Sequence, residues 1–391
     1  MVVSSGRSLR VLVTSTPGAG HRGPLAPLAA ALHAAGHQVL WATAEEACDR
    51  VRAIGFDAVA CGMSVGERVA ALAPQMPEIM ALDPRQRRQR LFVGFFAEIA
   101  APRMLADLTR VFDSFQPDVA IHEMAELAAA PIAAGRGIPH VTVAFSGALH
   151  PSVLGAVLDA LDEIWVANGV ADANNSDLFG ALYLHPFPRS FGPPPTEVTA
   201  MLMQAGDAVV QSAAPDWLSA LGAQRPLVYL TAGTERAANA APWVAAFAAL
   251  GAFDVDVVAT IGPILDAASL GTVPANVHIE RFVPQHLLVS RAAVVASHGG
   301  AGTVLGAAAH GVPQVLYPIA ADQWDNADAV SRAGAGVVCE LEHRDATALA
   351  EVFQRALREP ELRAAAGVVA AEIAAMPIAA DHVAAIEALV P

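Results

Sequence analysis

Short apolar runs alternate with alanine-rich, amphipathic segments along the whole chain of 391 residues. Apolar runs separated by helical patterns indicate parallel strands joined by helices, so an α/β protein is predicted. The helical patterns include Pro24–Ala35 and Leu91–Ser114. In the first half of the chain the expected strands are Val11–Thr14, Gln38–Ala42, Ala58–Cys61, Val119–His122 and His140–Ala144.

The pattern is interrupted once and then begins again. Leu182–Pro195 is dense in proline and has no sustained period, which predicts loops near the end of a first domain. Pro226–Thr234 again has the pattern of a strand with a glycine turn, and a helix is expected from Asn239. Further strands are expected at Val255–Thr260, Val277–Glu280, Ala293–Ser297 and Gln314–Tyr317. Two similar halves are therefore predicted, with ligands bound in a cleft between them, at the carboxyl ends of the strands.

Composition excludes several classes of protein. The formal charge of −15 argues against a nucleic-acid partner, although a helix N-terminus can still bind a small anion. The three cysteines, Cys48, Cys61 and Cys339, have no metal-ligand spacing, so neither zinc nor a disulfide framework is expected. The first residues form no signal peptide, and no apolar run approaches about 20 residues. A soluble, cytoplasmic protein without a membrane span is predicted.

The glycine-rich stretch TPGAGHRGP, residues 16–24, supports two interpretations. Gly18-x-Gly20-x-x-Gly23 follows a strand and precedes a helix, as in the dinucleotide fingerprint, and the acidic pair at 45–46 lies where a ribose carboxylate is expected. This pattern favours an NAD-dependent oxidoreductase. His21, however, lies inside the glycines, which raises the alternative that the loop serves the histidine.

A second glycine turn is more informative. The segment HGGAGT, residues 298–303, follows the apolar strand Ala293–Ser297 and leads into a helix. Glycines allow a backbone to approach a phosphate closely, and a helix N-terminus supplies free N–H groups and a partial positive charge. The pattern therefore predicts an anion site, and the alternative is a tight turn selected for packing.

Three motifs together resemble the glycosyltransferases of the GT-B fold. The segment HGGAGT…GVPQVLYP…DQWDNA resembles their nucleotide-sugar signature, Phe282-Val-Pro-Gln285 resembles W-x-P-Q, and GHRGP at 20–24 resembles GHxxP. The resemblance spans the chain and is strongest to bacterial natural-product enzymes of the calicheamicin type, relatives of the UDP-glycosyltransferase superfamily. It implies two facing Rossmann-like domains with an interdomain cleft: an acceptor domain at 1–212 and a nucleotide-sugar domain at 213–374. A C-terminal helix at 375–391 would pack back on the first domain.

The resemblance also assigns the donor site. The residues that would hold the diphosphate are His298, the turn residues Gly300, Ala301, Gly302 and Thr303, and the hydroxyl of Thr234. Phe282 would stack on the base, and the backbone of Val283 would contact its edge. Asp322 and Gln323 match the pair that bonds the donor sugar. Asn326 matches the family pattern too, but it could equally bond locally within its helix.

Two departures from the family pattern bear on the nucleotide. Phe282 stands where tryptophan is common, which weakens stacking without abolishing it. Gly306 stands where many members have a glutamate that bonds the ribose hydroxyls. Loss of that carboxylate suits a nucleotide without a 2'-hydroxyl, so a dTDP-sugar is favoured over a UDP-sugar as donor.

In the family, the histidine of GHxxP is the general base. The resemblance gives this role to His21, with Glu123 as the carboxylate that orients it and stabilises the imidazolium. His122 and Glu126 are neighbours that compete for the role of Glu123. Arg22, beside the base, could lower the pKa of His21 or contact a phosphate, and the sequence does not separate these roles.

The resemblance implies an inverting, metal-independent hexosyltransferase without a cofactor, and no DxD metal site is evident. It would move a sugar or deoxysugar to a hydroxyl of an apolar aglycone such as a polyketide. The expected acceptor segments, Met63–Ala81, Arg90–Ala106 and Phe145–Leu161, are rich in apolar residues. The sequence is compatible with a homodimer. An inactive sugar-nucleotide-binding partner protein is the other alternative, and the joint presence of the expected base, its carboxylate and the sugar-binding pair counts against it.

Overall fold

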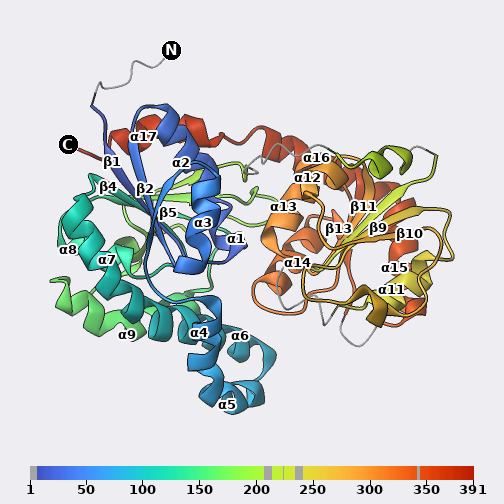
Figure 1. The fold of residues 1–391 in the computed structure, drawn as a ribbon, viewed down its shortest axis with the longest axis horizontal. Coiled ribbons are helices and arrows are strands. Elements are labelled where there is room, and N and C mark those ends of the chain that lie inside the picture. The colour runs from blue at the N-terminus through green and yellow to red at the C-terminus, as the bar shows by residue number, and fades with distance from the viewer. Residues whose placement is uncertain (1–6, 207–213, 223, 234–240, 341–343) are drawn as a thin grey trace. The chain divides into compact units, whose positions relative to one another are not determined.

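The computed structural model describes residues 7–206, 214–222, 224–233, 241–340 and 344–391. They divide into two compact units, each with its own parallel sheet (Figure 1). Unit 1 comprises Met1–Pro186, Pro194–Ala208 and Pro377–Pro391, and unit 2 comprises Phe187–Pro193 and Val209–Met376. The prediction of two α/β halves is thereby confirmed.

The sheet of unit 1 has seven parallel strands in the order β3-β2-β1-β4-β5-β6-β7. The strands are β1 (Arg10–Thr14), β2 (Gln38–Thr43), β3 (Asp57–Ala60), β4 (Val119–Glu123), β5 (His140–Val143), β6 (Leu182–His185) and β7 (Ala200–Leu202). The first five lie within about one residue of the predicted runs. The loop prediction for Leu182–Pro195 is wrong in its first part, because β6 is a fully buried strand beside β5.

Helices cover both faces of this sheet. The helices of unit 1 are α1 (Ala19–Arg22), α2 (Leu25–Ala34), α3 (Glu45–Ala53), α4 (Val65–Leu72), η1 (Ala73–Gln75), α5 (Met76–Ala81), α6 (Pro84–Phe92), the π-helix η2 (Val93–Ala100), α7 (Ala101–Phe115), α8 (Ala129–Gly135), α9 (Pro151–Ala167) and α10 (Asn175–Phe179). Alternate residues of β1 point to opposite faces: Val11 and Val13 pack with α2, whereas Leu12 packs with α7 and α8.

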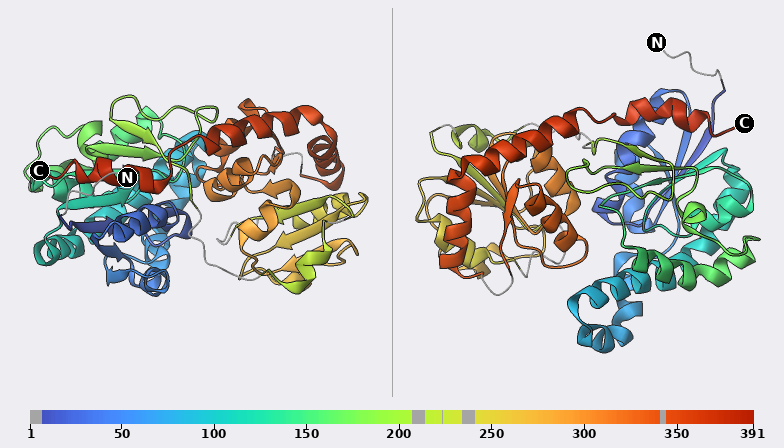
Figure 2. Two further views of the ribbon diagram at one scale, coloured as in Figure 1. Left: turned by 90° about the horizontal axis from the view of Figure 1, so that it is seen from above. Right: turned by 180° about the vertical axis from the view of Figure 1, so that it is seen from behind.

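The end of the chain belongs to unit 1. The helices η7 (Ala379–His382) and α17 (Val383–Glu387) lie against α2, as the red ribbon shows in Figure 2. Ile386 is fully buried in the same cluster as the core residues of α2, and Nε2 of His37 lies 3.1 Å from Oε1 of Glu387. Apolar burial and this ion pair therefore hold the C-terminal segment on the first sheet.

Unit 2 contains a six-stranded parallel sheet in the order β10-β9-β8-β11-β12-β13. The strands are β8 (Leu227–Thr231), β9 (Asp256–Thr260), β10 (Val277–Glu280), β11 (Ala292–Ser297), β12 (Gln314–Leu316) and β13 (Gly336–Val338). The helices are η3 (Asp216–Ala220), α11 (Trp243–Leu250), η5 (Ala267–Leu270), α12 (Gln285–Val289), α13 (Ala301–Ala309), α14 (Gln323–Arg332), α15 (Ala346–Arg358) and α16 (Pro360–Ala374).

A short segment of the first half of the sequence is part of unit 2. The predicted first domain, 1–212, includes 187–193, but these residues bond to helices of unit 2. The amide of Ser190 donates to Glu372, and the carbonyl of Phe191 accepts from Arg332. Within the described ranges, no single helix could span a membrane; only the bent pair of 360–374 and 379–387 has the required length and composition when the two are taken together.

A buried histidine pair in unit 1 predicts loss of stability in acid. Nε2 of His122 lies 3.0 Å from Nδ1 of His140, and burial lowers the pKa of His122 to about 4 and that of His140 to about 3. A histidine of the unfolded chain becomes protonated near pH 6.5, so below that pH the unfolded chain binds more protons than the folded one. The contribution of this pair to the free energy of unfolding should therefore decrease as the pH falls from 6.5 towards 4.

His140→Asn should reduce this decrease, because its amide can replace Nδ1 in the hydrogen bond but does not titrate. Each buried histidine can contribute up to about 1.4 kcal/mol per pH unit. Urea unfolding of both proteins at pH 5, 6 and 7 measures the difference. Equal pH dependence of the wild type and the variant would show that this pair is not the source.

Candidate active site

The glycine loop of unit 1 is shaped around a histidine. After β1 the chain turns into the single helical turn α1, where His21 is the third residue. A β-carbon added at Gly18 would lie 2.7 Å from Cδ2 of His21, whereas one at Gly20 would have nothing within 4 Å. Gly23 has an ordinary right-handed helical conformation. The glycine at 18 is therefore needed because the imidazole folds back over it.

His21 lies against a buried carboxylate. Its Nδ1 is 3.1 Å from Oε1 of Glu123, the last residue of β4, which is fully buried. The backbone N–H of Thr16 (3.1 Å) and its hydroxyl (2.9 Å) donate to the same oxygen, and the N–H of Ala125 donates to Oε2 at 2.6 Å. Since Nδ1 faces the carboxylate, Nε2 is the nitrogen that can accept a proton.

These contacts keep Glu123 ionised. Burial opposes its charge, but the His21 imidazole and the hydrogen bonds from Thr16 and Ala125 outweigh this and hold the pKa of Glu123 below its usual value. An ionised carboxylate fixes the orientation of the imidazole and favours its protonated form. The pair is therefore suited to take a proton from a substrate.

The other residues expected near His21 make different contacts. Glu126 is hydrogen-bonded to Thr14, and His122 lies against His140. Of the three candidates, only Glu123 is paired with His21 in the described structure. Arg22 is buried, and its Nε donates to the carbonyl of Pro17 at 3.2 Å, so it helps to hold the loop.

Two aromatic rings border the imidazole. The ring centroid of His21 lies 4.3 Å from that of Phe145 and 5.5 Å from that of Phe96. Phe96 is on the π-helix η2, and Arg68 of α4 lies over its ring at 5.5 Å. The sequence identified both segments as acceptor regions but did not identify these two rings, because an eight-residue π-helix has no clear sequence signal.

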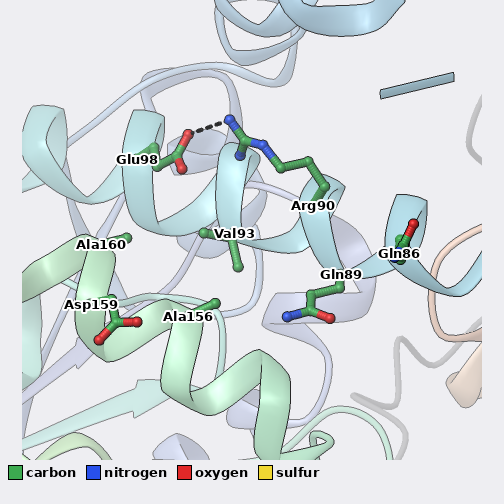
Figure 3. A pocket seen from close by; sticks show the side chains of 8 residues that line it. All are labelled: Gln86, Gln89, Arg90, Val93, Glu98, Ala156, Asp159 and Ala160. Atoms are coloured by element: carbon green, nitrogen blue, oxygen red, sulfur yellow. Dashed lines mark ion pairs between the residues drawn. The ribbon is translucent and has the colours of Figure 1, made fainter. Parts of the chain in front are cut away.

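A hollow lies between α6, η2 and α9, of which η2 contains Phe96 and α9 follows Phe145 in the sequence (Figure 3). Its volume is about 510 Å³, and its lining includes the ion pair between Arg90 and Glu98 at 2.9 Å. The lining residues are Gln86, Gln89, Arg90, Val93, Glu98, Ala156, Asp159 and Ala160. His21, Phe96 and Phe145 do not line this hollow.

In unit 2, glycines surround a second histidine. β-Carbons added at Gly233 and Gly300 would lie 2.9 Å and 2.7 Å from ring atoms of His298. Gly299 has a φ of +87°, which glycine adopts without strain. Burial lowers the pKa of His298 to about 4, and its Nδ1 has no hydrogen-bond partner among the described residues. The imidazole is therefore neutral at pH 7. Its Nδ1 is a buried polar atom that no described residue hydrogen-bonds.

The turn at 298–303 is supported by the start of α14. Nδ2 of Asn326 donates to the carbonyl of Gly299 and to Oδ2 of Asp322, both at 2.9 Å. Oε1 of Gln323 accepts from the amides of Ile319 (2.8 Å) and Ala320. Asn326 therefore has the local bonding role that the sequence left open.

These contacts bring the turn that carries the predicted donor residues Gly300–Thr303 together with the predicted pair Asp322 and Gln323 at the carboxyl end of the second sheet. Ala321, just before Asp322, has a φ of +53°, a strained conformation of the kind found at functional sites. Gly300 precedes α13, whose first residues are Ala301, Gly302 and Thr303, so their backbone groups lie at a helix N-terminus as expected.

The expected base-binding segment follows β10. Phe282 is 66% exposed and Val283 is buried. The side chain of Gln285 bridges to α13: it accepts from Thr303 Oγ1 at 3.0 Å and donates to the carbonyl of Gly302 at 3.3 Å. A β-carbon at Gly306 would lie 2.4 Å from Nε2 of Gln285. Thr234 lies outside the described residues. Across the described part of the chain, no His, Cys, Asp and Glu side chains are grouped as for a metal ion.

Two Rossmann-like units with parallel sheets are the architecture of GT-B glycosyltransferases. Glycosyltransferase VinC, solved in complex with dTDP, matches with a TM-score of 0.80 at 26% identity, covering 98% of this chain and 99% of that one. Glycosyltransferase SnogD from Streptomyces nogalater matches with a TM-score of 0.77 at 28% identity, covering 98% and 100%. The protein is a glycosyltransferase, and the alternative of an NAD-dependent oxidoreductase is wrong.

The family follows from the sequence matches. The erythromycin biosynthesis protein CIII-like N-terminal domain matches residues 30–233 and the corresponding C-terminal domain matches residues 243–389, so the chain belongs to this family. L-demethylnoviosyl transferase of Streptomyces niveus is 34% identical over 84% of each chain. 4'-demethylrebeccamycin synthase of Lentzea aerocolonigenes is 29% identical, over 97% of this chain and 99% of its own. The first of these relatives is named as a transferase of the demethylnoviosyl group, and the family description names erythromycin biosynthesis.

Gly18→Ala should lower sugar transfer while the protein stays folded. The added β-carbon would lie 2.7 Å from Cδ2 of His21 and displace the ring from Glu123. A misplacement of about 1 Å can reduce turnover about 100-fold. Gly20→Ala is the matched control, because its β-carbon meets nothing within 4 Å. Turnover and the unfolding midpoint should be measured for both; equal losses would mean that the loop backbone, not the ring position, matters.

Proposed function

We propose that the protein is an inverting glycosyltransferase that moves a sugar or deoxysugar from a dTDP-sugar to a hydroxyl of an apolar aglycone such as a polyketide. The 3.1 Å contact between Nδ1 of His21 and Oε1 of Glu123 carries the proposal. The names of several relatives support the substrate class, among them tylactone mycaminosyltransferase and 10-deoxymethynolide desosaminyltransferase. The donor nucleotide is supported by the dTDP complex of VinC.

His21 is the general base in this proposal. Nε2 removes the proton from the acceptor hydroxyl as its oxygen attacks the anomeric carbon, and the bond from that carbon to the diphosphate oxygen breaks. A single displacement from the opposite face inverts the anomeric configuration. The positive charge that forms on the imidazole lies beside the ionised Glu123, which stabilises it.

The leaving diphosphate would be held without a metal ion or a cofactor. Backbone N–H groups at the start of α13 provide a partial positive charge, and the glycines at 299 and 300 allow a phosphate to approach. His298 is neutral at pH 7, because burial lowers its pKa to about 4, so it would act as a hydrogen-bond donor and not as a cation. Asp322 and Gln323 would contact the donor sugar.

The acceptor would lie against the aromatic rings beside the base. Phe145 and Phe96 are half-buried, and both contact the His21 ring. A flat or reduced polycyclic aglycone can cover such rings and exclude water from the hydroxyl that reacts. This arrangement favours an apolar acceptor over a free sugar.

His21→Ala should lower turnover about 10²- to 10⁴-fold, the usual contribution of a positioned general base. Binding of dTDP should not change, since the expected nucleotide residues belong to unit 2. Glu123→Gln should lower turnover less than His21→Ala does, because the base itself remains. Steady-state kinetics in the presence of EDTA, with a dTDP-sugar, test this; His33→Ala, an exposed histidine of α2, is the control.

The acceptor can separate the role of the base from a role in binding. A phenol ionises at high pH and needs less help, so raising the pH should partly restore His21→Ala with phenolic acceptors but not with alcohols. If His21→Ala instead abolished dTDP binding and left the chemical step intact, the loop would be a phosphate site and the proposal would fail. A wild type that binds dTDP but transfers no sugar would indicate an inactive binding protein.

The proposed donor predicts that dTDP binds more tightly than UDP. Gly306→Glu should favour UDP about 3- to 10-fold, the effect of one added hydrogen bond to a ribose hydroxyl. The new side chain must first displace the amide of Gln285, which lies 2.4 Å from the β-carbon position. Gly306→Ala causes the same displacement without the carboxylate and is the control. Calorimetry with both nucleotides decides; equal affinities in the wild type would remove the argument from Gly306.

A further inference from the structure

Two buried carboxyl groups on one turn contact two threonines of the segment that carries His21. Glu123 ends β4, and the N–H of Glu126 donates to the carbonyl of Glu123 at 2.9 Å. Glu123 accepts from Thr16, as described above, and Glu126 is hydrogen-bonded to the hydroxyl of Thr14, the last residue of β1. Both carboxyl side chains are almost completely buried. The turn after β4 therefore holds the turn after β1 at two points.

Both carboxyl groups accept hydrogen bonds, but of the two only Glu123 faces an imidazole. Glu123 faces three N–H or O–H donors and the imidazole of His21. Oε1 of Glu126 accepts from the N–H of Ala128 at 2.8 Å, and Oε2 contacts the Thr14 hydroxyl. Burial raises the pKa of Glu126 to about 7, whereas that of Glu123 is lowered. Environments that separate two carboxyl groups in this way assign them different protonation states.

The surroundings of Glu126 supply no positive charge to favour its ionised form. The titratable groups that act on it from β4 are Glu123, which is ionised, and His122, which burial keeps neutral. The thiol of Cys61, after β3, interacts with it too, and burial raises the pKa of that thiol to about 12. Its contacts from β1 and from the turn before α8 are the uncharged Thr14 and Ala128.

We propose that Glu126 is a positioning residue for sugar transfer: its buried carboxyl group ties the end of β1 to the turn after β4. The inference rests on the proposed role of His21 as the base. Oε2 of Glu126 accepts from the Thr14 hydroxyl and Oε1 accepts from the N–H of Ala128, so both of its oxygens are used. These two hydrogen bonds of Glu126 fix the distance between the His21 loop and Glu123.

A second negative charge on this turn would lie beside Glu123 in an apolar interior, where repulsion between like charges is poorly screened. Below about pH 7 a protonated Glu126 supplies the hydrogen bonds of a carboxyl group without that charge.

Three variants test the proposal. Glu126→Gln keeps the shape and the hydrogen bonds of a neutral acid, Glu126→Leu removes both hydrogen bonds, and Thr14→Val removes the hydroxyl partner. For each we would measure kcat and acceptor KM from pH 5.5 to 9 and dTDP binding. Glu126→Leu and Thr14→Val should lower kcat about 10-fold or more, as expected for a misplaced base, with dTDP binding unchanged.

Glu126→Gln should rescue most of this loss, because its amide can keep both hydrogen bonds. Equal losses in the Gln and Leu variants would overturn the proposal.

Unfolding supplies a readout that needs no activity and therefore stands if His21 proves not to be the base. A buried acid with a raised pKa keeps its proton where the unfolded chain has lost it, so the contribution of Glu126 to the free energy of unfolding decreases as the pH rises from 4.5 through about 7. Glu126→Gln should remove this decrease and gain stability over the wild type between pH 5 and pH 8. An unchanged difference across that range would show that Glu126 is ionised in the folded protein.

Discussion

The buried carboxylate of Glu123 is the interaction on which the first half of the site depends. A fully buried charge is costly, and here it is offset by donors from Thr16, Ala125 and His21. Those donors come from the turns after β1 and β4, which are neighbouring strands with Thr14 opposite His122. Because both strands run in the same direction, their carboxyl ends meet at one edge of the sheet, and residues about 100 positions apart form one hydrogen-bonded group.

Unit 2 uses the same arrangement for a different purpose. Its neighbouring strands β8 and β11 end with Thr231 opposite Ser297, and the next residues place Gly233 and Gly300 against the ring of His298. In both units a glycine gives space to an imidazole at less than 3 Å from its β-carbon position. This is why the pattern at 18–23 imitates a dinucleotide fingerprint: glycine is needed wherever another group comes close to the backbone, whether that group is a phosphate or a side chain.

The sequence predicted elements whose signal is local. Apolar runs located five strands of the first sheet to within about one residue, whereas the three-residue strands β7 and β13 were not predicted. The residues VGFFAEIA would also fit an α-helix, so the π-helix that brings Phe96 to His21 was not predicted. Glu123 and Glu126 could not be separated, because both follow one strand. Their difference lies in which donors the turn after β1 presents, and those donors are distant in sequence.

In the proposed mechanism, the base of unit 1 and the diphosphate-binding turn of unit 2 should respond differently to pH. His298 is neutral across the range in which enzymes work, and backbone N–H groups do not titrate, so the diphosphate would meet a constant field of dipoles. Proton transfer is confined to unit 1, where His21 changes charge beside the carboxylate of Glu123. An enzyme with a formal charge of −15 and no lysine can in this way stabilise an anionic leaving group with backbone dipoles and a neutral imidazole.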